Sequence, residues 1–146
     1  MQGNDLASYA PISQATLFEG VLASKPEGLA KAKAQFAYVA NNWERYISLW
    51  KPNEIPIKHA IDLTNRYQVG IVVYTLLPEY LVDSIEKWLM RRGMSTAVTA
   101  YATIEDLASD LKFFPSIQKV YTSDEEQARI IGFKSTVVTT KTAWSV

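Results

Sequence analysis

The chain lacks cysteine altogether, and His59 is its only histidine among 146 residues. Without cysteine it can form no disulfide bond, no thiolate nucleophile and no cysteine-based metal site. Because His59 is the only histidine, a metal site with several histidine ligands from one chain is excluded as well. Long apolar runs are missing too, because the most apolar stretch, Val69–Leu77, is far shorter than the roughly 20 residues of a membrane-spanning helix. We therefore expect no thiol chemistry and no membrane span.

An excess of charge of either sign is also absent, because the chain contains 15 Lys and Arg residues and 15 Asp and Glu residues. Proteins that bind nucleic acid usually carry a basic excess, so the net charge does not indicate a nucleic-acid partner. A net charge near zero gives little protection against self-association, which favours a protein partner or a homo-oligomer. Residues Met1–Ala10 show neither the basic nor the apolar region of a signal peptide, so we expect a cytoplasmic protein.

Apolar residues are what the chain has in quantity. They make up 48% of the residues and aromatic residues make up 12%, which is too apolar for a disordered chain. The length fits one domain with one hydrophobic core. We expect a single domain over residues 1–146, with an N-terminal arm at 1–11 and a C-terminal tail at 141–146.

Strand-like and helix-like patterns alternate along the chain. The run Ile71–Tyr74 is continuously apolar and rich in β-branched residues, as in a parallel strand buried on both faces. The other predicted strands are Ile12–Ala23, Ala97–Tyr101, Gln118–Thr122 and Ser135–Thr139. The predicted helices are a long one from Ser24 that carries the stripe Leu29–Trp50, then Ile57–Tyr67, one from Pro78 to Gly93, one from Thr103 to Lys112, and Asp124–Ile131. This alternation predicts an α/β fold with a mostly parallel five-stranded sheet in a three-layer, Rossmann-like core.

The block Asn53–Met94 carries the most specific pattern. Its apolar strand ends at Thr75, Pro78-Glu79 starts a helix, and Gly93 ends that helix. This order resembles the second-motif region of compact haloacid dehalogenase (HAD)-like phosphatases, including the polynucleotide 3′-phosphatase type common in phages. In that family a Ser or Thr at the strand end holds the phosphate, and Thr75 matches this position.

The resemblance extends over about residues 12–140. Leu17-Phe18-Glu19-Gly20-Val21-Leu22 resembles the nucleophile loop of the family, which reads Asp-x-Asp-Gly-Thr/Val-Leu. Lys119-Val120-Tyr121-Thr122-Ser123-Asp124 resembles its acidic strand end, and Gly132 resembles the helix stop that follows. The resemblance implies a HAD-like core without a large cap domain.

The departures from the family pattern bear on function. The carboxylate nucleophile that takes the phosphoryl group is Leu17 here, and leucine cannot attack phosphorus. The general acid becomes Glu19. Thr75-Leu76-Leu77 replaces the frequent Thr-Gly-Arg, so the phosphate-reading Arg is lost. Mg²⁺ prefers several oxygen ligands, and only Glu19 and Asp124 remain as candidates.

Simpler interpretations stand beside these roles. Thr75 at a strand end can satisfy a local hydrogen bond, and Glu19 can be a solvated charge. Asp124 with the two glutamates that follow it can cap a helix. His59 is expected to be partly exposed on a helix. Arg91-Arg92 and the pair Lys31 and Lys33 could bind phosphate, but short basic pairs in a neutral protein more often belong to solvated faces.

The sequence therefore favours a non-catalytic HAD-like domain without a cofactor, with the degenerate pocket positions Leu17, Glu19, Thr75 and Asp124. Its expected role is a structural or protein-binding component of a larger assembly, such as a phage virion or a phage accessory protein in the host cytoplasm. The alternative is a divergent Mg²⁺-dependent phosphatase that acts on a phosphorylated nucleotide or polynucleotide end. A flavodoxin-like or receiver-like fold is a third reading of the same alternation.

Overall fold

The computed structural model describes residues 13–26 and 43–146. Its main sheet contains β1 (Ser13–Leu17), β4 (Gly70–Thr75), β5 (Val98–Ala100), β6 (Ile117–Thr122) and β7 (Ser135–Val137). Its helices are α3 (Trp43–Ser48), α4 (Glu54–Tyr67), the 3-10 helix η1 (Glu79–Leu81), α5 (Val82–Met90), α6 (Ile104–Leu111) and α7 (Glu125–Ile131). Two short strands, β2 (Ala23–Ser24) and β3 (Lys51–Pro52), form a separate antiparallel pair.

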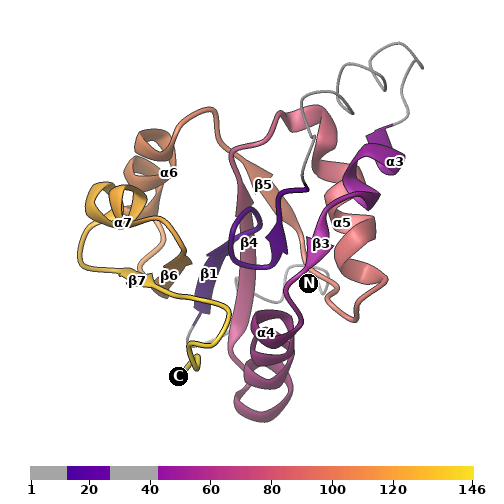
Figure 1. The fold of residues 1–146 in the computed structure, drawn as a ribbon. Coiled ribbons are helices and arrows are strands. Elements are labelled where there is room, and N and C mark those ends of the chain that lie inside the picture. The colour runs from indigo at the N-terminus through magenta and orange to yellow at the C-terminus, as the bar shows by residue number, and fades with distance from the viewer. Residues whose placement is uncertain (1–12, 27–42) are drawn as a thin grey trace, which may run out of the picture.

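The five main strands are all parallel and lie in the order β5-β4-β1-β6-β7 (Figure 1). Counted in chain order this is 3-2-1-4-5, the doubly wound arrangement of Rossmann-like sheets. Right-handed crossovers then place α4 and α5 on one face and α6 and α7 on the other. The predicted α/β, Rossmann-like fold is confirmed, and the sheet is wholly rather than mostly parallel.

Local signals in the sequence set several boundaries. The Thr103 hydroxyl accepts a hydrogen bond from Asp106 N at 3.2 Å and caps the start of α6. Gly132, which follows α7, has a φ of +92°, a conformation that ends a helix and that residues with a Cβ rarely adopt. Both boundaries agree with the prediction, because each depends on side chains within a few residues of the helix end.

Aromatic rings hold the loop after β1 to α5 inside the core. Phe18 is fully buried and meets Trp88 edge to face, with ring centroids 5.2 Å apart. It also contacts Trp50, at 5.7 Å between centroids. Trp88 Nε1 donates to the Trp50 carbonyl at 3.3 Å, so this buried indole keeps a polar partner.

The C-terminal tail packs against the sheet. The Trp144 ring stacks on Tyr121 with centroids 4.0 Å apart and planes at 12°. Beneath it, the Tyr121 hydroxyl donates to Gln14 Oε1 at 2.6 Å, and Gln14 Nε2 donates to the Ser145 carbonyl at 2.7 Å. In Figure 1 the yellow tail lies beside β1 and α4. The tail thus takes part in covering the sheet without forming a helix.

The N-terminal elements differ from the prediction. The first strand ends at Leu17 instead of Ala23, because Gly20 turns the chain at a φ of +81° and Leu22 and Ala23 donate back to the Phe18 carbonyl. Ser24, the predicted helix cap, lies in β2, and its hydroxyl donates to Asn53 Oδ1 at 2.7 Å. Most of the predicted long helix falls at residues 27–42, outside the described residues, and α3 accounts for part of the remainder.

Within the described ranges, no helix combines the length and the apolar character needed to cross a membrane.

Candidate functional site

The four predicted pocket positions lie along one edge of the sheet. Leu17 is the last residue of β1, and Thr75 is the last residue of β4. Glu19 follows β1 by two positions, and Asp124 follows β6 by two positions. Ligands of doubly wound sheets bind outside the carboxyl ends of the strands, where the strand order reverses, which here is between β1 and β6. We refer to the carboxyl ends of β4, β1 and β6 as the carboxyl edge.

Glu19 and Thr75 are joined directly at this edge. The Thr75 hydroxyl donates to Glu19 Oε1 at 2.5 Å, and Leu76 N donates to Glu19 Oε2 at 2.9 Å. The Thr75 hydroxyl also accepts from Leu77 N at 3.0 Å. The end of β4 thus forms a cradle of one hydroxyl and one amide for an anion, and both of its donors bind the chain's own carboxylate.

The interpretation of Glu19 as a solvated charge is therefore wrong. Its side chain is half-buried between the ends of β1 and β4. Burial raises the pKa of the Glu19 carboxyl above the ordinary 4.5, although the hydrogen bonds from Thr75 and Leu76 act to lower it. The sequence could not reveal this contact, because the two partners are far apart in the chain. The local role predicted for Thr75 holds only in part, since its acceptor is distant in sequence.

Leu17 contributes no polar group to the edge. Its side chain is 1% exposed and belongs to the hydrophobic core. Its neighbour in β4 is Tyr74, and the Tyr74 carbonyl accepts a hydrogen bond from Phe18 N at 2.9 Å. The position that the resemblance assigns to a nucleophile therefore carries a buried aliphatic chain.

The loops after β1 and β6 approach each other closely. A Cβ added to Gly20 would overlap the Ser123 hydroxyl oxygen, and Gly20 also has a positive φ. Both observations favour glycine at this position. The crevice expected at the β1/β6 switch point is therefore narrow at Gly20.

Asp124 acts as a helix cap, as the simpler interpretation predicts. Its Oδ1 accepts from Gln127 N at 3.0 Å at the start of α7. Thr122 completes this turn, because its hydroxyl accepts from Asp124 N at 3.2 Å. With Glu19 already bound to Thr75, the two carboxylates proposed as Mg²⁺ ligands both have other partners. Among the described residues, no group of three or more Asp, Glu, His or Cys side chains lies close enough together to hold a metal ion.

The basic candidates have structural partners. Arg91 pairs with Glu44 on α3. Arg92 lies over the Trp88 ring at 3.7 Å and donates to the Trp88 carbonyl at 2.9 Å. Both arginines thus have intramolecular contacts on the side of the molecule that carries α3 and α5. His59 is half-buried, as predicted, and Lys31 and Lys33 lie outside the described residues.

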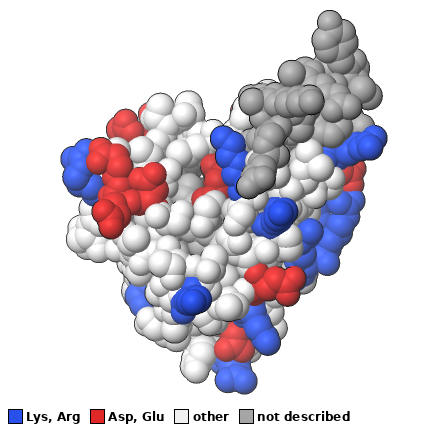
Figure 2. Space-filling view, in the orientation of Figure 1, with Lys and Arg blue, Asp and Glu red and all other residues white. Residues whose placement is uncertain are grey.

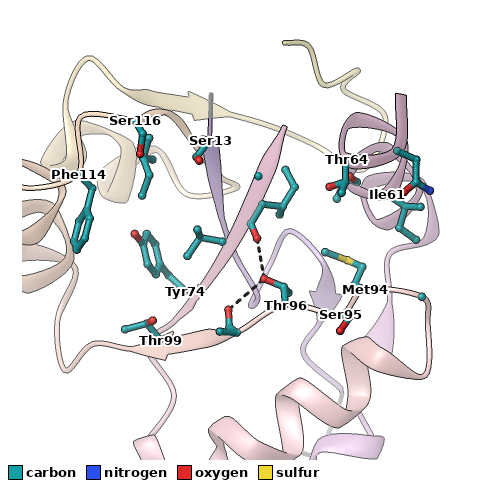
Figure 3. Close-up of a pocket in the computed structure, with 18 of the residues that line it drawn as sticks. Ser13, Ile61, Thr64, Tyr74, Met94, Ser95, Thr96, Thr99, Phe114 and Ser116 are labelled. Carbon is teal, nitrogen blue, oxygen red and sulfur yellow. Dashed lines mark hydrogen bonds between the residues drawn. The ribbon is translucent and has the colours of Figure 1, made fainter. Parts of the chain in front are cut away.

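A pocket of about 660 Å³ lies away from this edge, beside β4 and β5. It exists because β5 is short: it pairs with Val73–Thr75 only, and the Thr96 hydroxyl bonds the Ile71 carbonyl at 2.8 Å where a longer strand would continue. Figure 3 shows Phe114 and Tyr74 toward one end of the pocket and Ile61 and Thr64 toward the other. No sequence motif marks these residues, and the prediction missed the pocket.

Tyr74 and Thr75 illustrate the separation of the two regions. Successive side chains of a strand point to opposite faces, so Tyr74 faces the pocket while Thr75 binds Glu19.

Neither a protein-family model, nor a curated protein, nor a solved structure matches the chain. The interpretation of both regions therefore depends on the geometry of the chain itself.

Proposed function

We propose that the chain is a non-catalytic HAD-like domain that serves as a structural or protein-binding component of a larger assembly, such as a phage virion or a phage accessory complex. The observation that carries this proposal is the state of the carboxyl edge. Leu17 is buried at the nucleophile position, and the Glu19 carboxylate occupies the two donors at the end of β4. A phosphate would have to displace this carboxylate and would still lack a nucleophile.

The arrangement of the fold supports the HAD-like part of the proposal. The predicted pocket positions Leu17, Glu19, Thr75 and Asp124 come from three adjacent strands and lie at the same edge. This agrees with the way in which the family resemblance aligns the sequence.

Exposed aromatic side chains support the binding part. Phe113 is 76% exposed and Phe133 is 96% exposed, which is unusual for residues that gain so much from burial. Lys134 Nζ donates to the Leu111 and Phe114 carbonyls, at 3.3 and 3.4 Å, so the segments that carry the two rings are tied together. We call Phe113, Phe114 and Phe133 the phenylalanine patch. Exposed aromatic groups of this kind are enriched at protein interfaces.

Charge is distributed unevenly although the net charge is zero. Figure 2 shows acidic side chains gathered over α6 and α7 and basic ones toward the side of α3 and α5. The first turns of α6 and α7 contribute Glu105, Asp106, Glu125 and Glu126. Such separation favours an oriented contact with a basic surface, which includes the basic side of a second copy.

A phosphatase assay separates the proposal from the Mg²⁺-dependent alternative. The full chain is incubated with Mg²⁺ and either p-nitrophenyl phosphate or a 3′-phosphorylated oligonucleotide, beside Glu19→Ala and Asp124→Ala. We expect no turnover above a protein-free blank for any of the three proteins. Mg²⁺-dependent turnover by the wild type that both substitutions abolish, while Asp106→Asn retains it, would establish the enzyme instead.

Sedimentation velocity tests the assembly. We expect the wild type to associate increasingly as its concentration rises, and Phe113→Ser with Phe133→Ser to shift it toward the monomer. Tyr67→Ser is the matched control, because Tyr67 is 57% exposed at the end of α4 and lies outside the patch. The binding role would be contradicted by a wild type that stays monomeric at every concentration and that binds no other protein in a way that Phe113→Ser with Phe133→Ser abolishes.

A further inference from the structure

The pocket beside β4 and β5 is unlike the carboxyl edge in its charge. Among the described residues that line it, Asp110 is the one charged side chain. Its Oδ2 accepts a hydrogen bond from the Tyr101 hydroxyl at 2.9 Å. No described side chain pairs with its Oδ1, and no described Lys or Arg forms an ion pair with it. The pocket therefore presents an uncompensated carboxylate to whatever enters it.

Three aromatic rings line the pocket together with this carboxylate. Tyr74 and Tyr101 meet nearly edge to face, with centroids 5.5 Å apart and planes at 80°. Burial, followed by the nearby Asp110 carboxylate, raises the pKa of Tyr74 to about 12, so this phenol stays neutral. Phe114 lines the same end and is 45% exposed, which leaves ring surface for a ligand. Aromatic faces attract cations through their quadrupole.

The remainder of the lining is apolar or carries hydroxyl groups. Val72, Met94 and Ile117 supply apolar surface, and Ser95, Thr96 and Thr99 supply hydroxyls. The volume of about 660 Å³ is within the range of sites for small organic molecules. An anion would meet the Asp110 carboxylate without a compensating cation, whereas an ammonium group would be attracted by both the carboxylate and the rings.

We propose that this pocket binds a small amphiphilic amine, with its ammonium group between Asp110 and the rings of Tyr74, Tyr101 and Phe114 and its apolar body along Val72 and Met94. The site lies on the face of β4 opposite Thr75 and shares Phe114, but neither Phe113 nor Phe133, with the phenylalanine patch. Because Asp110 lies outside the patch, a substitution there tests the pocket separately from the proposed assembly role. Asp110 selects the charge of the ligand, and the Tyr101 hydroxyl holds the carboxylate in place.

Three probes of nearly equal size and different charge test the proposal. Phenethylamine is the cation, 2-phenylethanol is the neutral counterpart, and 3-phenylpropionate is the anion. Each is titrated into the ¹⁵N-labelled full chain while amide shifts are followed in two-dimensional NMR spectra. We expect saturable shifts at Thr99, Tyr101 and Asp110 with phenethylamine, weaker binding of the alcohol, and no binding of the carboxylate.

Substitution of the carboxylate gives the decisive comparison. We expect Asp110→Asn to weaken phenethylamine binding about tenfold, corresponding to roughly 1.4 kcal/mol, and to leave 2-phenylethanol unchanged. Asp106→Asn is the matched control, because Asp106 lies on the same helix and does not line the pocket. The spectra of both variants also report whether the fold is retained.

Three outcomes would overturn the proposal. The first is equal affinity for the amine and the alcohol, which would make the site merely apolar. The second is an Asp110→Asn variant that binds phenethylamine as tightly as the wild type does. The third is the absence of saturable binding by any probe, which would mean that the pocket holds no ligand of this class.

Discussion

The carboxyl edge and the β4/β5 pocket lie on opposite faces of β4, and each holds one carboxylate, Glu19 and Asp110, in different surroundings. At the edge, both Glu19 oxygens are bound, by the Thr75 hydroxyl and by Leu76 N. In the pocket, the Asp110 carboxylate has one side-chain partner among the described residues, the Tyr101 hydroxyl. A carboxylate that is half-buried and doubly bound acts within the fold, whereas one that is exposed and partly bound can act on a ligand.

This difference predicts where substitutions change stability and where they change binding. Groups that satisfy each other inside a protein are costly to separate, because the partner left behind loses both water and its hydrogen bond. Groups that face solvent lose little when one of them is replaced. Substitutions at the carboxyl edge should therefore destabilise the fold, and substitutions at Asp110 should leave its stability unchanged.

The largest effect is expected from Thr75→Val, which keeps the shape of the side chain and removes the hydroxyl. Glu19 Oε1 then loses its donor and Leu77 N loses its acceptor. Water cannot replace the lost hydroxyl easily, because the Thr75 side chain is 0% exposed. We expect the free energy of unfolding to fall by about 3 kcal/mol. Urea denaturation followed by circular dichroism measures this change.

Thr75→Ser is the control for that substitution, because serine keeps the hydroxyl and loses only a methyl group. Its cost should stay near 1 kcal/mol. If valine and serine destabilise the protein equally, the hydrogen bond to Glu19 contributes little to stability beyond the backbone pairing of β1 with β4, and the contrast between the two regions weakens.

A smaller effect is expected from Gly20→Ala. The positive φ alone should cost about 1–2 kcal/mol for a residue with a Cβ. The overlap with the Ser123 hydroxyl adds to this cost. Adding Ser123→Ala to Gly20→Ala should remove the cost of the overlap and leave the cost of the positive φ. A double-mutant cycle of unfolding free energies separates the two costs. Strict additivity would mean that the loops after β1 and β6 do not touch.

What the sequence predicted well depends on neighbours along the chain. The β-branched run at Ile71–Tyr74 falls within β4, and the cap at Asp124 starts α7 as expected. In both cases the deciding groups lie within one strand or one helical turn. The parallel sheet followed from the alternation of such elements, since parallel strands require crossover connections.

The parts that were missed depend on contacts between distant residues. Phe18, Val21 and Leu22 are apolar and buried in a turn, so their hydrophobicity was mistaken for a continuing strand. The pairing of β2 with β3 and the bond between Glu19 and Thr75 each join segments that a local pattern cannot relate. The pocket is a consequence of the shortness of β5, which only the register of the sheet reveals.

A pH series sharpens the comparison at Glu19. Because burial raises the pKa of this carboxyl in the folded state, the folded protein holds its proton more tightly than the unfolded chain does. The contribution is fully present below the ordinary pKa of 4.5 and is lost as the pH rises through the higher folded value. Relative to Glu19→Gln, which cannot titrate, the wild type should therefore gain stability as the pH is lowered from 7 toward 4.5.

Unfolding midpoints of the two proteins at matched pH values give this difference. Other carboxylates titrate in the same range in both proteins, so their contribution cancels in the subtraction. A difference that is constant with pH would show that the pKa of the Glu19 carboxyl is the same in the folded and unfolded chain. A dependence of the opposite sign would show that the hydrogen bonds from Thr75 and Leu76 outweigh burial and lower this pKa.

The smallest effect is expected from Asp110→Asn. This carboxylate is exposed and forms no ion pair with a described residue, so its neutral amide counterpart should change the free energy of unfolding by less than about 0.5 kcal/mol. The amide oxygen can still accept from the Tyr101 hydroxyl, which preserves the one contact that the structure gives it. Urea denaturation of this variant beside Thr75→Val makes the comparison directly. If Asp110→Asn lowers the free energy of unfolding as much as Thr75→Val does, Asp110 stabilises the fold. Its carboxylate would then not be available to bind an amine in the pocket.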